Sequence, residues 1–291
     1  MKKLFFILIA LFFVGCDDGD FAIEVLDFDD ANIQLCGDYV FYKLTNDNTE
    51  ALLIQIVSND ELFLQKEGTK EYPLSANNHI YYRIFDGDAS SYFCKEVQPV
   101  NPKVVEQWEA TSGTIEIVTT LIEDDNDGIP AADEGYNAED PTSSQDTDGD
   151  GLPDYKDIDD DGDNVPTAQE GYNVDDPSTS LDTDGDGIPN YLDNDDDDDG
   201  VLTRLENPNQ NNNPTDDITD GYEVPDYLEP EVNDTYPDVA NRTHTFRKNY
   251  IHTIKIINGF QLQGDGQEIK YNVSGFNYGI YENNVTETHQ F

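Results

Sequence analysis

The stretch that decides the architecture runs from Asp146 to Asp157 and reads DTDGDGLPDYKD. A second copy, DTDGDGIPNYLD, occupies residues 182–193, so the motif recurs after 36 residues. The same step separates Glu134, Glu170 and Glu206, and also Tyr155, Tyr191 and Tyr227. A fixed period of this size is typical of a tandem structural array. We therefore predict that residues 121–230 form a repeat array with a 36-residue period.

Both copies of this first loop type place oxygen donors at the spacing of a hand-type calcium loop. Such a loop has acidic side chains at positions 1, 3 and 5, a carbonyl at 7, an oxygen donor at 9 and a carboxylate at 12. Glycine at position 6 permits the sharp turn that this spacing requires. The predicted ligands are Asp146, Asp148, Asp150, Asp154 and Asp157 in one copy, and Asp182, Asp184, Asp186, Asn190 and Asp193 in the other.

A second loop type alternates with the first and places glutamate at position 12, where bidentate ligation is expected. Its predicted ligands are Glu123, Asp125, Asp127 and Glu134; Asp159, Asp161, Asp163 and Glu170; and Asp195, Asp197, Asp199 and Glu206. Position 9 is Ala131, Thr167 or Thr203, so we expect water there. A sixth loop, from Ile218, lacks acids at positions 1 and 5. We expect this loop to bind weakly or not at all, and to cap the array.

The donor set indicates the metal. Carboxylate and carbonyl oxygens without sulfur or imidazole select hard cations, and six or seven of them at irregular angles suit Ca²⁺ better than Mg²⁺. The five well-formed loops predict about five Ca²⁺ ions. The alternative is a solvated acidic linker without defined sites. Random acidity would not keep aspartate at positions 1, 3 and 5 with glycine or asparagine at 6 and an acid at 12.

DTDGDGLPDYKD and DTDGDGIPNYLD carry a family resemblance. The loops resemble thrombospondin type-3 repeats and, more distantly, dockerin loops, and the resemblance covers about residues 123–206. It implies calcium-filled loops wrapped around a line of ions, with little apolar core. The cysteines of the animal thrombospondin pattern are missing here, so metal alone must order the segment.

The charge of the chain points to cations as partners. The formal net charge is −48, and loss of Lys2 and Lys3 with a signal peptide would make it −50. Residues 123–229 hold 36 acidic residues against Lys156 and Arg204. Such a surface repels nucleic acid and anionic lipid head groups. Without counter-ions the segment is expected to be expanded or disordered.

The N-terminus predicts export. Met1-Lys2-Lys3 and an apolar run to Val14 indicate a signal peptide over residues 1–15, too short for a retained membrane span. Phe13-Val14-Gly15-Cys16 resembles a bacterial lipobox, although Phe13 replaces the usual leucine. This resemblance implies a lipid on Cys16. The acidic residues that follow resemble the tether of Bacteroidetes surface lipoproteins, which implies a lipid-anchored, surface-exposed place on the outer membrane. The alternative is an ordinary signal peptide that contains a cysteine.

The flanking regions predict a mainly β fold. Residues 16–120 are expected to form a β-sandwich-like domain, and residues 231–291 a short C-terminal β segment that completes the first sheet or packs on it. Expected strands cover 39–44, 51–57, 80–85 and 114–118, then 251–257, 260–262, 268–273 and 278–281. Gly264-Asp265-Gly266 is expected to be a hairpin turn, and Trp108 a core residue.

The two remaining cysteines, Cys36 and Cys94, either form a disulfide in an exported chain or are buried thiols. We expect the disulfide. With only four histidines and no other cysteine, the donor count disfavours a Cys/His zinc site.

The patterns favour a non-enzymatic surface protein in which the array is a metal-stiffened spacer that presents β domains. One alternative is a glycan-binding or adhesion module, for which Tyr39, Tyr42, Tyr81, Tyr82 and Tyr281 are candidate contacts with a glycan or a surface protein. The other is an envelope enzyme with its site in a β domain. Neither a nucleophile motif nor a glycine-rich phosphate loop supports the enzyme.

Overall fold

The computed structural model describes residues 26, 28, 31–37, 39–58, 63–237, 240, 243–264, 266–271 and 275–289. The predicted signal peptide and the predicted lipidation residue, Cys16, lie outside these residues. The described helices are all one-turn 3-10 helices, and the long regular elements are strands. The predicted mainly β fold is therefore confirmed. None of the described helices has the length and apolar character needed to cross a membrane.

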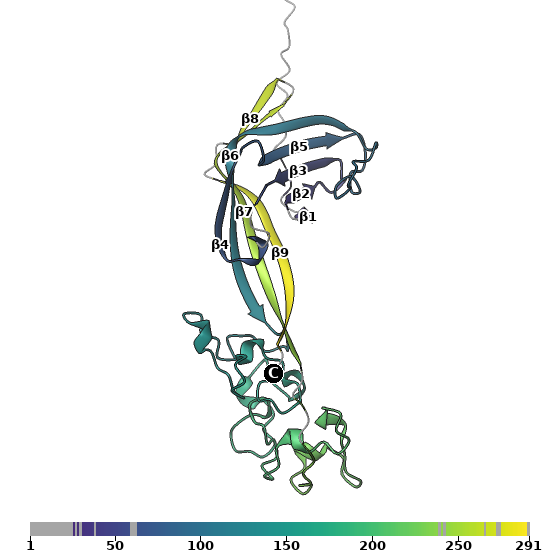
Figure 1. Ribbon diagram of the computed structural model, residues 1–291, viewed down its shortest axis with the longest axis vertical. Coiled ribbons are helices and arrows are strands. Elements are labelled where there is room, and N and C mark those ends of the chain that lie inside the picture. The colour runs from purple at the N-terminus through teal and green to yellow at the C-terminus, as the bar shows by residue number, and fades with distance from the viewer. Residues whose placement is uncertain are drawn as a thin grey trace, which may run out of the picture.

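One antiparallel sheet contains all nine described strands (Figure 1). They are β1 (Gln34–Cys36), β2 (Val40–Leu44), β3 (Glu50–Gln55), β4 (Gly68–Pro73), β5 (His79–Phe85), β6 (Val104–Asp124), β7 (His244–Gly264), β8 (Gln267–Tyr271) and β9 (Phe276–His289). The order is β1-β2-β3-β5-β6-β7-β8, with β4 on β6 and β9 on β7. The sequence pattern located parts of most strands but missed the short strand β1 and also β4, whose side chains are mostly exposed.

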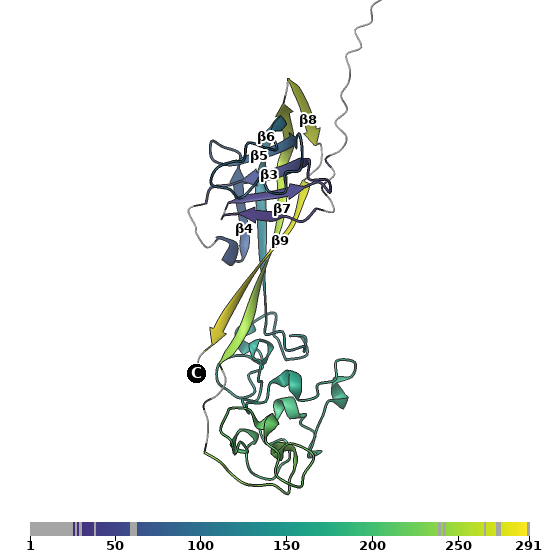
Figure 2. The ribbon, with the colours of Figure 1, turned by 90° about the vertical axis from the view of Figure 1, so that its right-hand side faces the viewer.

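The core lies inside a fold of this sheet. Strands β1, β2, β3 and β5 cross over the long strands β6, β7 and β9 (Figures 1 and 2). The buried residues between the two halves are Leu26, Phe28, Phe41, Leu52, Ile54, Ile56, Ile80, Tyr82, Trp108, Ile115, Ile117, Ile254, Ile256, Phe260, Leu262 and Tyr278. The two halves of one sheet thus face each other as the layers of a sandwich do, and Trp108 is a core residue as expected.

Strand β3 is apolar on both faces because both faces are covered. Leu52 and Ile54 point into the main core, while Ala51 and Leu53 join a second cluster with Phe85. Ala89, Tyr92 and Phe93 from the segment after β5 complete that cluster. A disulfide between Cys36 and Cys94, with Cα atoms 4.9 Å apart, ties this segment to β1.

Reduction of this disulfide should destabilise the sheet. The bond closes a loop of 58 residues, and in the chain-entropy model such a loop contributes about 4 kcal/mol. We expect the paired Cys36→Ala and Cys94→Ala substitutions to lower the free energy of unfolding by about this amount in urea denaturation. Calcium uptake by the distant array should be unaffected. An unchanged urea midpoint would show that the disulfide does not constrain the unfolded chain.

Beyond Thr119 the sheet narrows to a ribbon of three strands, formed by residues 119–124, 244–252 and 281–289. A bulge near Gly113 lies where the pairing of β6 passes from β5 to β4. Gly113 has φ +132°, and a Cβ atom there would lie 2.9 Å from Cγ2 of Ile256. Both the positive φ and the short contact with Ile256 therefore disfavour a side chain at position 113.

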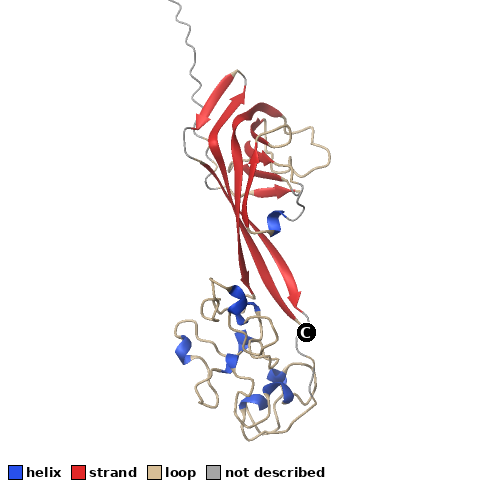
Figure 3. Cartoon of the chain, turned by 60° about the vertical axis from the view of Figure 1, so that its left-hand side comes forward, coloured by secondary structure: helices blue, strands red, loops and turns tan. Residues whose placement is uncertain are grey.

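The C-terminal strands complete the first sheet, which decides between the two expected alternatives. β7 pairs with β6 from Glu109↔Gln263 to Asp124↔Arg247, and β9 pairs with β7 along the ribbon. Gly264 pairs with Gln267, as the expected hairpin requires, although Asp265 lies outside the described residues. The array is therefore an insertion between two paired strands and lies at the end of the ribbon (Figure 3).

Within the array the chain forms loops and short turns rather than strands. The 3-10 turns are Pro141–Ser143, Asp154–Lys156, Thr167–Gln169, Pro177–Thr179, Asn190–Leu192, Thr203–Leu205, Pro214–Asp216 and Asp226–Leu228. A ninth described turn, Phe63–Gln65, belongs to the sheet region. Turns that begin at residues 154, 190 and 226 are separated by 36 residues, and so are those at 167 and 203.

Candidate calcium centre

Short hydrogen bonds from the backbone shape every loop of the array. In the loop from Asp146, the amide of Asp150 donates to Oδ1 of Asp148 (2.9 Å), and the amide of Leu152 donates to Oδ1 of Asp150 (2.6 Å). The same two bonds recur in the other four loops. Aspartate at positions 3 and 5 therefore forms turns with the backbone two residues ahead. One oxygen of each carboxylate is used in this way.

The second carboxylate oxygen of several of these aspartates is buried inside the protein. Among the described residues, Oδ2 of Asp125, Asp127, Asp161, Asp197 and Asp199 is buried without a hydrogen-bond partner. Both carboxylate oxygens of Glu134, Glu170 and Glu206 are likewise buried without a hydrogen-bond partner among the described residues. These three residues are 3%, 1% and 1% exposed. Buried carboxylates are stable only when they are paired or coordinate a metal. The donors present thus fit calcium.

These oxygens converge within single loops. One ligand atom from each of Asp125, Asp127 and Glu134 lies within 4.8 Å of the others. The same holds for two further triplets, Asp146–Asp148–Asp150 and Asp159–Asp161–Asp163. In each of the first three loops the structure therefore brings together three of the predicted side chains at the separations that one cation spans.

Burial and crowding make these carboxylates resist ionisation. Burial, followed by the charge of Asp127, raises the pKa of Asp125 to about 9. Burial, followed by Asp125 and Asp127, raises the pKa of Glu134 to about 10. In the last loop, burial and then Asp197 and Asp199 raise the pKa of Glu206 to about 9. A divalent cation would favour the ionised form of these buried carboxylates and would also relieve their mutual repulsion.

The loop from Asp182 is the most open of the five. Asp182, Asp184 and Asp193 are half-buried and Asp186 is exposed. The pKa of Asp193 is raised by burial and then by Asp186 and Asp184, so these predicted ligands are close enough for their charges to interact.

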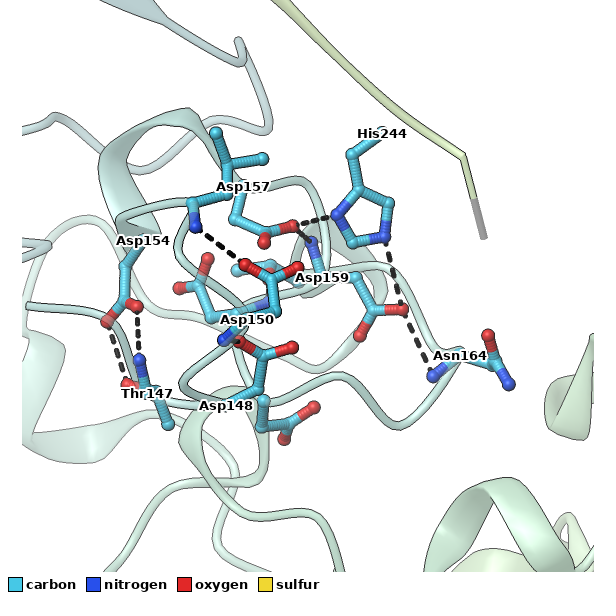
Figure 4. A network of polar contacts seen from close by, with 12 residues as sticks. Thr147, Asp148, Asp150, Asp154, Asp157, Asp159, Asn164 and His244 are labelled. Atoms are coloured by element: carbon cyan, nitrogen blue, oxygen red, sulfur yellow. Dashed lines mark hydrogen bonds and ion pairs between the residues drawn. The ribbon is translucent and has the colours of Figure 1, made fainter. Parts of the chain in front are cut away.

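Position 9 of the first loop type has a different role from the one predicted. Both oxygens of Asp154 accept hydrogen bonds from Thr147, one from its amide (2.7 Å) and one from its hydroxyl (2.8 Å) (Figure 4). Asp226 in the sixth loop accepts the same two bonds from Thr219. In Asn190, Oδ1 accepts a hydrogen bond from the amide of Thr183, and Nδ2 donates one to the hydroxyl oxygen of Thr183. These side chains therefore close the loop between positions 2 and 9, and their predicted ligation is not what the contacts show.

Glu123 is also not brought to the site predicted for it. It is the penultimate residue of β6, and its carboxylate lies 3.1 Å from Nζ of Lys156 and 3.4 Å from Nζ of Lys248. Lysine amines at these distances compete with a metal for the same oxygens. Glu123 therefore joins the array to the ribbon, and the first site depends on other donors.

His244 is a residue of the candidate site that the sequence pattern missed. It is the first residue of β7, is 1% exposed, and contacts Asp157 through Nδ1 (Figure 4). Its Nε2 lies 4.0 Å from Oδ2 of Asp159. Nitrogen of His244 and oxygens of Asp150 and Asp157 also lie within 4.8 Å of one another. The returning strand thus contacts the junction between two loops, although it is 85 residues away in the sequence from Asp159.

The tyrosines considered as glycan contacts are packing residues. Tyr42 and Tyr82 are each 4% exposed, and Tyr39, Tyr81 and Tyr281 are half-buried against the two clusters of the sheet. Their burial supports the role of sheet residues rather than that of an exposed platform.

Comparison of the chain with protein-family models, with curated proteins and with solved structures gave no match.

Proposed function

We propose that this protein is a calcium-binding, lipid-anchored cell-envelope protein whose acidic array is ordered by about five Ca²⁺ ions. The observation that carries the proposal is the set of buried carboxylate oxygens without hydrogen-bond partners, which recurs in the second loop type at Glu134, Glu170 and Glu206. A bound cation would stabilise the ionised form of such buried oxygens, which otherwise must bind a proton.

The topology changes the expected spacer role. Because β6 and β7 pair with each other, the array does not separate two β domains. Cys16 precedes Leu26, a core residue of the sheet, by ten residues, and ten residues span at most about 35 Å. A lipid on Cys16 would hold the sheet near the outer membrane, and the ribbon would carry the array. We therefore propose that the calcium-ordered array, and not a β domain, is the part of the protein that is held out from the membrane.

A second candidate function is the capture of a glycan or a surface protein. It is supported by a cavity of about 420 Å³ beside the disulfide, whose lining includes Arg83, Tyr92, Phe93 and Glu96. Binding to a glycan array with and without calcium would separate this candidate from the first. We propose no catalytic role, because the sequence carries neither a nucleophile motif nor a glycine-rich phosphate loop.

Calcium titration of the chain from Asp17 onward tests the proposed function. After removal of metal with a chelator, calorimetry should show uptake of about five ions, with dissociation constants near ~10⁻⁴–10⁻³ M as in other extracellular modules. The hydrodynamic radius should decrease during the titration. Magnesium at the same concentration is the control, because its rigid octahedral shell suits these loops poorly. No uptake at millimolar calcium would leave an acidic linker and refute the proposal.

A further inference from the structure

We infer that Asp160 and Asp196 are calcium ligands that act across repeats, each completing the site of the preceding copy of the second loop type. Asp160 would complete the site of Asp125, Asp127 and Glu134, and Asp196 that of Asp161, Asp163 and Glu170. Neither aspartate belongs to the ligand pattern of a hand-type loop, because each stands at position 2 of its own loop. The inference rests on the proposed function, since it concerns the same ions.

Asp160 is buried, although its own loop gives its side chain no hydrogen-bond partner. It is 1% exposed, and neither carboxylate oxygen has a hydrogen-bond partner among the described residues. Its amide donates to Oγ1 of Thr167 (3.0 Å), which holds the backbone in place. The neighbouring charges that act on Asp160 are those of Asp154, Glu134, Asp127 and Asp125. Three of these four residues are the ligands of the preceding loop.

Asp196 shows the same arrangement one repeat later. One oxygen of Asp196 lies within 4.8 Å of ligand atoms of Asp163 and Glu170. Asp196 is 2% exposed, and its Oδ1 has no hydrogen-bond partner among the described residues. Its amide donates to Oγ1 of Thr203 (3.3 Å), as that of Asp160 does to Thr167. The 36-residue period therefore repeats the geometry as well as the residue type.

The second loop type needs a donor from outside. Position 9 is Ala131 in one loop, and in the next it is Thr167, whose hydroxyl is engaged by the amide of Asp160. In the first loop, Glu123 at position 1 is paired with lysines. Calcium takes six to eight oxygens, so a carboxylate from the next repeat supplies a donor that the loop lacks.

A tyrosine from the following repeat lies beside each completed site. Asp160 and Glu134 are among the charges that raise the pKa of Tyr191, after burial. Asp196 and Glu170 act in the same way on Tyr227, which is 5% exposed. The hydroxyl groups of the two tyrosines are therefore near enough to the two sites to interact with their charges.

The last site of the array lacks this ligand. The residue 36 positions after Asp196 is Val232, which is 8% exposed. The charges of Asp197, Asp199, Asp195 and Asp226 nevertheless act on Glu206. The final site thus has its own loop donors and Asp226 of the sixth loop nearby, but a valine stands at the position that corresponds to Asp160 and Asp196. An array of sites that share ligands must end at such a position.

Asparagine variants test the inference, and they are best measured in the chain from Asp17 onward. Asp160→Asn and Asp196→Asn should each weaken one site at least about tenfold, the scale seen when groups around a metal are altered. Asp175→Asn is the matched control, because Asp175 is exposed and the charge change is the same. Asp196→Glu, which restores a carboxylate, should recover part of the lost affinity. Val232→Asp should tighten the last site.

Terbium provides a readout that a purely structural role would not change. Tb³⁺ bound near Tyr191 or Tyr227 is excited through the tyrosine, and its lifetimes in H₂O and D₂O report the number of bound waters. Each asparagine variant should add about one water at the affected ion, because water replaces a lost ligand. Circular dichroism at saturating calcium checks that each variant folds.

The outcomes separate the inference from the proposed function. If the parent chain takes up no calcium, the proposed function fails and the inference fails with it. If the parent binds about five ions but Asp160→Asn and Asp196→Asn match Asp175→Asn in affinity and terbium hydration, only the inference is overturned. Weakened binding, added water and recovery in Asp196→Glu would together establish the two cross-repeat ligands.

Discussion

Withdrawal of calcium at pH 7 should unfold the array and leave the sheet folded. The buried apolar side chains of the array are few: Ile129, Leu152, Tyr155, Val165, Tyr191, Tyr227 and Val232. Buried acids outnumber them, so burial of apolar surface cannot offset the repulsion. We expect a larger hydrodynamic radius and protease cleavage confined to residues 121–230. The core around Trp108 should keep its fluorescence.

The pH dependence of this unfolding follows from the direction of the pKa shifts. The folded-state pKa values of Glu134 (about 10) and Asp160 (about 11) lie far above those of unfolded carboxyl groups. Between the unfolded and folded values the folded state binds more protons, so its stability falls as pH rises. The metal-free array should therefore be most compact near pH ~4 and expand towards pH 7.

Size measurements between pH 4 and pH 7, with and without calcium, check this behaviour. Calcium should abolish the expansion at pH 7, because the ion replaces the protons that neutralise the sites. The β sheet gives an internal control, since its disulfide and apolar core do not depend on metal. A metal-free array that stays compact at pH 7 would contradict the idea that calcium orders it.

Glu170→Gln should have the largest effect of any single substitution in the array. Glu170 is 1% exposed, both its oxygens lack hydrogen-bond partners among the described residues, and it faces Asp163 and Asp196. An amide removes the charge and one of two oxygens from the expected bidentate ligand. We expect this site to lose at least about 100-fold in affinity, so that calorimetry detects about one ion fewer.

Glu139→Gln is the matched control, because Glu139 is exposed and the chemical change is identical. It should leave the number of bound ions unchanged. Because Asp196 comes from the following repeat, Glu170→Gln should also raise protease sensitivity beyond its own loop, near residues 190–206. Equal calcium uptake by the two variants would show that Glu170 is not a ligand.

Much of the candidate site was predictable because the ligands of one loop lie within 12 residues of each other. Asp125, Asp127 and Glu134 meet as their spacing predicts, since turns between neighbouring residues bring them together. Local hydrogen bonds also explain the position at which the predicted ligand role differs from the observed contacts. Asp154 has an oxygen donor at the right position, but Thr147 engages both of its oxygens. Spacing alone does not distinguish a carboxylate that converges with other predicted ligands from one that accepts hydrogen bonds within its own loop.

By itself, the sequence determined the 36-residue period, the strand content and the loop spacing, because these depend on residue type and on neighbours in the chain. Only the tertiary structure decided that β7 pairs with β6, that His244 contacts Asp157, and that Asp196 faces Glu170. Each of these contacts joins residues that are distant in the sequence. The physical reason is that such pairings depend on how strands and loops pack in space, which a local pattern does not record.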